Sequence, residues 1–209
     1  MTHEGGTTVD FWQYEREALE EGRALICGCD EAGAGPLAGP VYAAAVILTF
    51  GEDIPGLDDS KKLTEKRREE LFPVIQERAL AWSVAWVDAA EIDETDILSA
   101  RMRAMQLAID GLSQRPDFAL IDGNRDRGRS AAIAVPHRCV VKGDSLSASI
   151  AAASVLAKVS RDRHMVEMAE RYPEYRFDKH KGYGTKLHYE LLRTYGPSPI
   201  HRRTFLKNL

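Results

Sequence analysis

The segment Ile26-Cys27-Gly28-Cys29-Asp30-Glu31 is a short apolar stretch that ends in two acids. The same pattern returns twice, in Leu120-Ile121-Asp122 and in Val140-Val141-Lys142-Gly143-Asp144. Short apolar runs of this kind are typical of buried strands. In open α/β sheets, ligands bind at the carboxyl ends of the strands. We therefore expect four acids to converge on one crevice: Asp30, Glu31, Asp122 and Asp144.

The rest of the chain predicts a sheet flanked by helices. Further strands are expected at 41–50 and 80–87, and helices at 9–22, from Thr64 onward, and at 93–112, 147–171 and 187–195. This alternation indicates the α/β class with a central sheet. The link between the first two strands is short, which favours an antiparallel pair there and therefore a mixed sheet.

Length and composition fit one domain. The chain has 209 residues, of which 44% are hydrophobic and 29% are charged, the usual mix of a globular protein. We expect a single domain over residues 1–209, in which residues from about 172 to 209 form a C-terminal helical extension. No apolar run reaches the length of a membrane span, and the N-terminus lacks the features of a secretory signal. Together with only three cysteines, this predicts a cytoplasmic protein without membrane contact.

Charge is distributed unevenly along the chain. The net charge of −4 by itself argues weakly against a nucleic-acid partner. Residues 1–122, however, hold 11 Lys and Arg against 24 Asp and Glu, whereas residues 123–209 hold 17 against 8. A basic half points to contact with a polyanion, although ordinary solvated surface gives the same pattern.

The four acids carry the clearest chemical signal. Carboxylates are hard oxygen ligands that suit Mg²⁺ or Mn²⁺, and four of them packed together repel one another unless cations neutralise them. Acids around two divalent ions are typical of metal-dependent phosphoryl chemistry. Each acid also has a structural explanation: Asp122-Gly123 is a common turn pair, Asp30-Glu31 suits a solvated turn, and Asp144 suits a helix cap.

Two glycine-containing segments suit contact with a substrate. Residues 33–39 (GAGPLAG) lack the spacing of dinucleotide and P-loop motifs, so they form either a tight turn or a bare backbone that a ligand approaches closely. Residues 180–185 (HKGYGT) place a tyrosine among glycines and basic residues, which suits stacking on a sugar or base or a turn with a packed ring. Lys61 and Lys62 are candidate phosphate contacts.

Five segments, in this order, resemble the bacterial ribonuclease HII family. They are residues 30–40 (DEAGAGPLAGP), 59–63 (DSKKL), 120–123 (LIDG), 142–145 (KGDS) and 180–185 (HKGYGT), and the closing 199–203 (PIHRR) also fits. The resemblance covers about residues 25–205. It implies a ribonuclease H-like fold, in which a mixed five-stranded sheet is flanked by helices and followed by a C-terminal helical segment.

The resemblance also implies an activity. The expected enzyme is an endonuclease that hydrolyses the RNA strand of RNA-DNA hybrids. It also cleaves 5′ of single ribonucleotides embedded in duplex DNA, as ribonucleotide excision repair requires, and leaves 3′-OH and 5′-phosphate ends. The resemblance further implies two Mn²⁺ or Mg²⁺ ions, and we expect a monomer. The family's catalytic and metal-binding acids fall on Asp30, Glu31, Asp122 and Asp144, and its substrate contacts fall on Gly33, Ala34, Gly35, Lys61, Lys62 and Tyr183.

One position departs from the family pattern. The first motif normally reads Gly-Arg-Gly, and here Ala34 stands in place of the arginine. In the family this loop contacts the 2′-hydroxyl largely through its backbone, which the two glycines preserve, whereas the phosphate contact of the arginine side chain is lost. Weaker junction specificity or affinity is therefore expected. The basic loop 124–136, with Arg125, Arg127 and Arg129, is expected to add phosphate contacts.

Three other classes stay open at the level of sequence. A different two-metal nuclease on the same fold would cut all-DNA duplexes. A non-catalytic binder would hold a hybrid without needing metal. A phosphatase of small molecules would have no use for the basic C-terminal half.

Overall fold

The computed structural model describes residues 10–123, 128 and 132–207. In this part of the chain, five strands form one sheet in the order β3-β2-β1-β4-β5. They are β1 (Ile26–Ala32), β2 (Val41–Ile47), β3 (Ala81–Val87), β4 (Phe118–Asp122) and β5 (His137–Val140). Strand β1 pairs antiparallel with β2 and parallel with β4, so the expected mixed sheet is confirmed.

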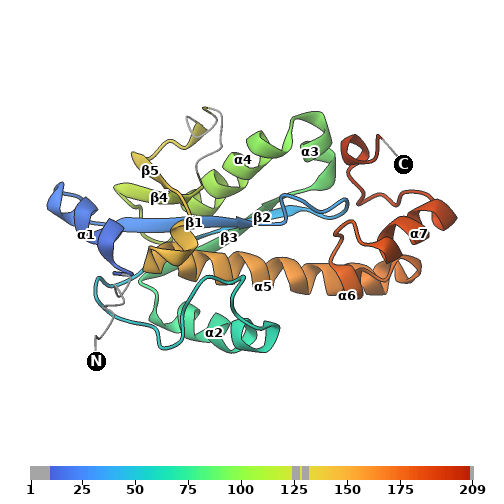
Figure 1. The fold of residues 1–209 in the computed structure, drawn as a ribbon. Coiled ribbons are helices and arrows are strands. Elements are labelled where there is room, and N and C mark those ends of the chain that lie inside the picture. Colours follow the sequence, from blue (N-terminus) through green and yellow to red (C-terminus); the bar gives the residue numbers. More distant parts are fainter. Residues whose placement is uncertain (1–9, 124–127, 129–131, 208–209) are drawn as a thin grey trace, which may run out of the picture.

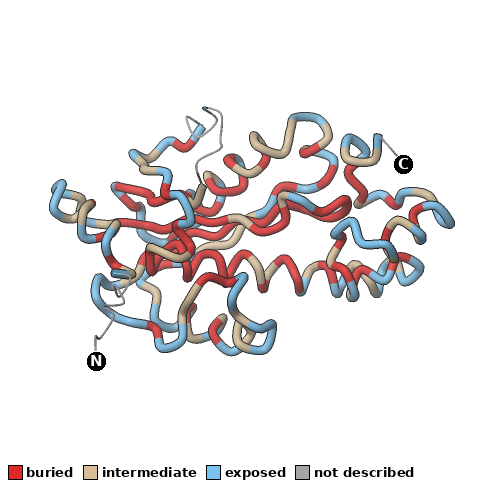
Figure 2. Tube along the Cα trace, viewed as in Figure 1, coloured by how far each residue is buried: buried red, intermediate tan, exposed pale blue. Residues whose placement is uncertain are grey.

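Helices cover both faces of the sheet. They are α1 (Gln13–Glu20), α2 (Glu65–Arg78), α3 (Ala89–Glu94), α4 (Ile97–Asp110), α5 (Ala148–Arg171), α6 (Phe177–His180) and α7 (Lys186–Tyr195). Helices α3 and α4 lie on one face, α5 lies on the other with α2 outside it, and α6 and α7 stand at the far end of α5 (Figure 1). The buried residues run along the sheet and along α5 (Figure 2).

Helix α5 lies unusually close to the sheet, because small residues meet at the contact. A Cβ atom on Gly28 of β1 would lie 2.2 Å from the carbonyl carbon of Ser149, so only glycine fits there. The start of α5 is also fixed. Ser147 caps the helix by accepting from the Ile150 amide at 3.2 Å, and Glu15 of α1 accepts from the Ser149 amide at 3.0 Å. This helix therefore has a defined position relative to β1.

Several sequence expectations need correction. The helix expected at 93–112 is two helices, because Asp88 and Asp96 each cap a separate one with their side chains. Strand β1 continues to Ala32, so Asp30 and Glu31, expected at the end of the apolar stretch, lie within the strand. Asp144 does not cap α5, since Ser147 does.

Two further expectations can be compared only with the residues that the structure describes. Arg125, Arg127 and Arg129 of the basic loop lie outside the described residues. No helix in the described segments is long and apolar enough to cross a membrane.

Candidate active site

Three aspartates meet at one edge of the sheet. In the parallel pairing of β1 with β4, Cys29 is opposite Ile121, so Asp30 and Asp122, one residue further on, are also neighbours. Asp144 follows β5 in a short 3-10 turn, η2 (Gly143–Ser145). Carboxylate oxygens of Asp30, Asp122 and Asp144 all lie within 4.8 Å of one another. The strand-end pattern therefore predicted this group from three separate segments.

Glu31 is not part of that group. Successive side chains of a strand point to opposite faces, but Glu31 still lies near enough for its charge to raise the pKa of Asp30 and of Asp122. The Glu31 carboxylate forms an ion pair with the Arg101 guanidinium of α4 at 2.6 Å, and both side chains are mostly buried. Its second carboxylate oxygen is buried without a hydrogen-bond partner in the described structure. Nothing in the sequence pattern pointed to Arg101.

The aspartates repel one another in a poorly solvated place. Burial, followed by the charges of Glu31 and Asp122, raises the pKa of Asp30 well above its usual range. Burial, followed by the charges of Asp144 and Glu31, raises the pKa of Asp122 to about 6. Both shifts mean that negative charge is costly here. A cation would relieve that cost, and hard carboxylate oxygens suit a divalent one.

One of the two predicted lysines reaches the acids. The Nζ atom of Lys61 donates to Asp144 at 2.6 Å. Although burial opposes the shift, this hydrogen bond and the nearby negative charges raise the pKa of Lys61. Lys62 instead pairs with Asp58 at 3.0 Å on the exposed surface. Both lysine side chains are therefore exposed, but only that of Lys61 reaches the aspartates.

The glycine loop and the tyrosine lie side by side. Gly33 is buried with a φ of +95°, while Gly35 is exposed. The Leu37 amide donates to the Gly182 carbonyl at 2.8 Å and so joins the two segments. The ring of Tyr183 is partly exposed, and the Arg161 guanidinium lies 5.6 Å from its centroid. Both predicted substrate-contacting segments therefore form one surface.

A network of buried histidines holds the tyrosine segment. His188 Nδ1 lies 2.9 Å from the Tyr183 carbonyl and His188 Nε2 lies 2.9 Å from His201 Nε2, while His201 Nδ1 accepts from the Ser198 amide at 2.9 Å. These bonds are all satisfied when both rings are neutral, with His188 donating to Tyr183 and His201 donating to His188. Burial, in each case the largest cause, lowers the pKa of His188 to about 4 and that of His201 to about 3.

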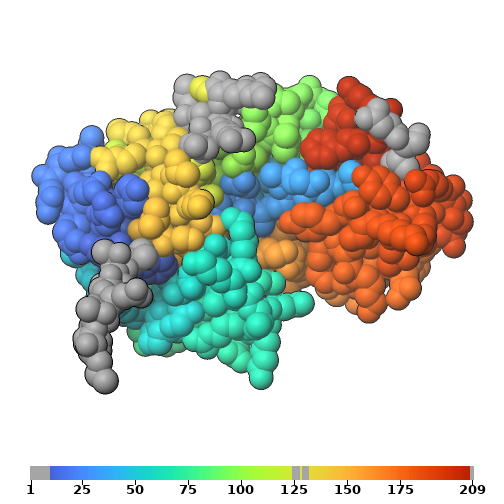
Figure 3. Space-filling model, in the orientation of Figure 1, coloured from blue at the N-terminus to red at the C-terminus, as the bar shows by residue number. Residues whose placement is uncertain are grey.

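The surface around the site is divided into two parts. In the space-filling view, the C-terminal segment and the segment near residues 55–75 stand apart, with part of α5 visible between them (Figure 3). Tyr183 belongs to the first segment and Lys61 to the second. A polyanion lying between them would therefore pass from one predicted contact to the other.

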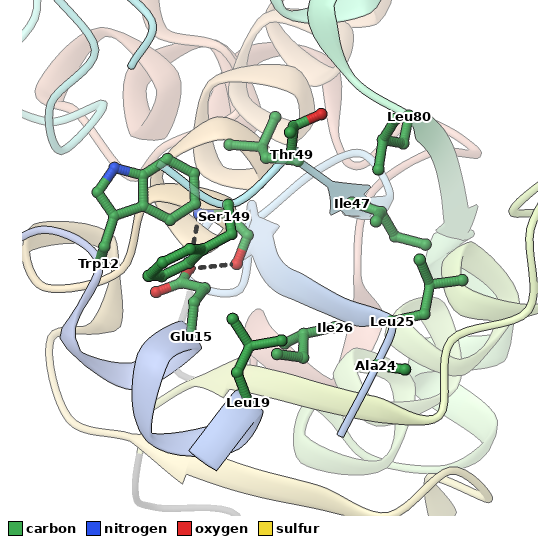
Figure 4. A pocket seen from close by; sticks show the side chains of 12 residues that line it. Trp12, Glu15, Leu19, Ala24, Leu25, Ile26, Ile47, Thr49, Leu80 and Ser149 are labelled. Atoms are coloured by element: carbon green, nitrogen blue, oxygen red, sulfur yellow. Dashed lines mark hydrogen bonds between the residues drawn. The ribbon is translucent and has the colours of Figure 1, made fainter. Parts of the chain in front are cut away.

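A cavity of about 160 Å³ beside α1 is separate from this site (Figure 4). Its walls are mostly apolar, and none of the four acids lines it. The carboxylate of Glu15 lies in it and accepts from the Ser149 hydroxyl at 2.6 Å. Glu15 is therefore engaged in holding α5 rather than in the aspartate group.

Comparisons with known proteins relate the chain to one family. A family model described as Ribonuclease HII matches residues 27–208. The chain is 51% identical over 200 residues to the Ribonuclease HII of Caldicellulosiruptor bescii, covering 96% of this chain and 95% of that protein. It is 54% identical over 181 residues to that of Idiomarina loihiensis, covering 87% and 95%.

Among solved structures, the crystal structure of the ribonuclease H2 from Pyrococcus horikoshii OT3 is similar, with a TM-score of 0.70 at 27% identity. The match covers 87% of this chain and 93% of that one. The range matched by the family model includes every segment that forms the site described above.

Proposed function

The chain belongs to the ribonuclease HII family and is a ribonuclease H, and from this premise we propose its substrates and its site. The enzyme hydrolyses the RNA strand of RNA-DNA hybrids. It also cuts duplex DNA on the 5′ side of single embedded ribonucleotides and leaves 3′-OH and 5′-phosphate ends. The observation that carries the proposal is the group formed by Asp30, Asp122 and Asp144, within 4.8 Å of one another.

In this proposal, Asp30, Glu31, Asp122 and Asp144 hold two divalent ions, Mn²⁺ or Mg²⁺. The raised pKa values of Asp30 and Asp122 support a resident cation, because a bound positive charge would offset both the burial and the repulsion that raise them. When bound, the two ions supply an activated water and stabilisation of the leaving oxygen. Glu31, whose charge already acts on Asp30 and Asp122, would complete the set.

The other side chains bind and orient the nucleic acid. Lys61 neutralises Asp144 and offers its remaining protons to a phosphate. The loop Gly33–Gly35 tests for a 2′-hydroxyl, which distinguishes RNA from DNA. Tyr183, with its partly exposed ring, stacks on a sugar at the junction. Lys62, which faces solvent, adds a peripheral phosphate contact.

The same proposal keeps one domain over residues 1–209, with residues 172–209 as its extension. It is supported by the packing of Phe177 and Leu192 with Met165 of α5 in one hydrophobic cluster. A monomer acting in the cytoplasm also stays a prediction, which gel filtration and cell fractionation test.

A cleavage assay with three labelled duplexes tests the proposal. One duplex carries a single ribonucleotide, one is an RNA-DNA hybrid and one is all DNA, each incubated with Mg²⁺, with Mn²⁺ or with chelator. We expect metal-dependent cutting of the first two only, and on the 5′ side of the single ribonucleotide. Asp122→Asn should remove cutting, whereas Asp110→Asn, which changes an exposed carboxylate on α4, should not. Cutting of all-DNA duplex, or cutting in chelator, would overturn the proposal.

A further inference from the structure

Two arginines are completely buried beneath the Gly33–Pro40 loop. Arg161 comes from α5 and Arg202 from the segment after α7, and neither side chain is exposed to solvent. Among the ion pairs of the described residues, neither guanidinium has a carboxylate partner within 4.0 Å. Burial of charge without a counter-charge is costly, so this arrangement needs an explanation.

The arginines bind the carbonyl groups of the loop. Arg202 donates to the carbonyls of Gly33 at 2.6 Å, Ala34 at 2.9 Å and Gly39 at 2.9 Å. Arg161 donates to the carbonyls of Ala38 at 3.3 Å and Pro40 at 3.2 Å. Five carbonyl groups of one loop therefore point inward.

The inward carbonyls set the direction of the amides. In a trans peptide, the C=O of one residue and the N–H of the next point to opposite sides. With the carbonyls of Gly33 and Ala34 held by Arg202, the N–H groups of Ala34 and Gly35 point away from it. In the described structure neither of these amides donates a hydrogen bond, and Gly35 is exposed. Two donors thus face the outside of the loop.

Arg161 also connects the loop to the tyrosine. A Cβ atom on Gly33 would lie 1.9 Å from Arg161 Nε, so the guanidinium lies directly against the loop backbone. The same guanidinium is 5.6 Å from the centroid of the Tyr183 ring. Its Nη1 atom is buried and has no hydrogen-bond partner among the described residues. One side chain therefore touches both segments proposed to contact substrate.

Arginine side chains keep their charge in proteins at neutral pH. Burial and the neighbouring charge of Arg161 lower the pKa of Arg202 to about 9, which still leaves it protonated. Two positive charges therefore lie under a loop whose position 34 is alanine instead of the family's arginine. A phosphate backbone above the loop would offset their burial.

We infer that Arg161 and Arg202 are positioning residues for ribonucleotide recognition. They hold the loop so that the amides of Ala34 and Gly35 face the 2′-hydroxyl, and their charge attracts the strand that lies above it. This inference rests on the proposed function.

Binding selectivity in the cleavage-dead Asp122→Asn background tests the inference. The readout is the ratio of affinities for the single-ribonucleotide duplex and the all-DNA duplex. Arg202→Lys keeps the charge but loses the guanidinium, whose N–H groups serve three carbonyls. We therefore expect the affinity ratio to fall about tenfold, which corresponds to the loss of one good hydrogen bond. The affinity for the all-DNA duplex should stay unchanged. Arg202→Met should also weaken all-DNA binding severalfold.

Arg163→Lys is the matched control, because Arg163 lies on α5 and pairs with exposed Glu69; both affinities should stay unchanged. A retained ratio in Arg202→Lys, or retained all-DNA affinity in Arg202→Met, overturns the inference. If the Arg202 variants do not fold, Gly33→Ala decides, because its methyl group displaces Arg161; a retained ratio there also overturns the inference. Wild-type cleavage of the single-ribonucleotide duplex, measured separately, tells whether the proposed function itself holds.

Discussion

Asp122→Asn should stabilise the metal-free protein at neutral pH even though it removes cleavage. The pKa of Asp122 is raised from 3.8 to about 6, first by burial and then by Asp144 and Glu31. A shift of about two pKa units corresponds to about 3 kcal/mol. Because the folded-state pKa is the higher one, the folded protein binds this proton more tightly than the unfolded chain does. The stabilisation is complete below about pH 4 and is lost as the pH rises through about 6.

Asparagine has nearly the same shape as aspartate and carries no charge at any pH. Its side-chain oxygen can still accept from the Asp144 amide, which lies 3.3 Å from Asp122 Oδ1. At neutral pH the variant should therefore avoid the loss of folding stability that the wild-type protein suffers when Asp122 ionises. For a chain of this length, about 3 kcal/mol corresponds to a rise in Tm of roughly 6–12 °C.

Thermal unfolding followed by circular dichroism in chelator measures the effect. The difference in Tm between variant and wild type should be large at neutral pH and small near pH 4. Added Mn²⁺ should raise the Tm of the wild type and leave that of the variant nearly unchanged. Asp110→Asn, at an exposed position, should show no such dependence. A variant that is no more stable than wild type at neutral pH would refute the electrostatic reasoning.

Three further predictions concern other contacts. Lys61→Met removes the cation that faces Asp144 and should lower kcat/KM on the order of tenfold or more, whereas Lys62→Met should stay within about twofold because its ion pair is exposed; equal effects in steady-state kinetics would contradict the assignment. Glu15→Ala leaves the start of α5 without its acceptor and should lower the free energy of unfolding by about 2–4 kcal/mol, which an unchanged midpoint in urea would disprove. Arg101→Met leaves a buried carboxylate unpaired and should cost about 3–5 kcal/mol; a second substitution, Glu31→Gln, should restore most of it, and no recovery would rule out the ion pair as the cause.

The sheet and the three aspartates could be predicted because each depends on local sequence. A short apolar run forms a buried strand wherever a sheet is available, and an acid at its end is carried to the same edge. The position of Glu31 outside the aspartate group could not be predicted in this way. Successive side chains of a strand alternate between its two faces, and this applies to Asp30 and Glu31 only because the strand continues to Ala32. In the sequence alone both acids end one apolar stretch, so nothing there distinguishes Glu31 from Asp30.

The helix boundary and the buried arginines were missed for different reasons. Apolar spacing continues across residues 89–110, so it does not reveal the break between the two helices. The break follows from Asp88 and Asp96, whose side chains accept hydrogen bonds from the backbone and so start two separate helices. Arg202 was visible only as part of a family segment, since a charged residue gives no sign in the sequence that it is buried. Its role depends on contacts with residues far away in the chain.

The Gly33–Pro40 loop has consequences for the order in which the protein acquires its specificity. The hydrogen bonds that Arg202 donates to this loop span 163 to 169 positions along the chain. During synthesis the loop leaves the ribosome early, and the side chain that orders it leaves long afterwards. Asp30, Asp122 and Asp144 all lie before residue 145, so the potential metal ligands are synthesised before the arginine that holds the loop proposed to select ribonucleotides. Local opening of the C-terminal segment in the finished protein would likewise release the loop, and with it the discrimination between RNA and DNA that we propose for this loop.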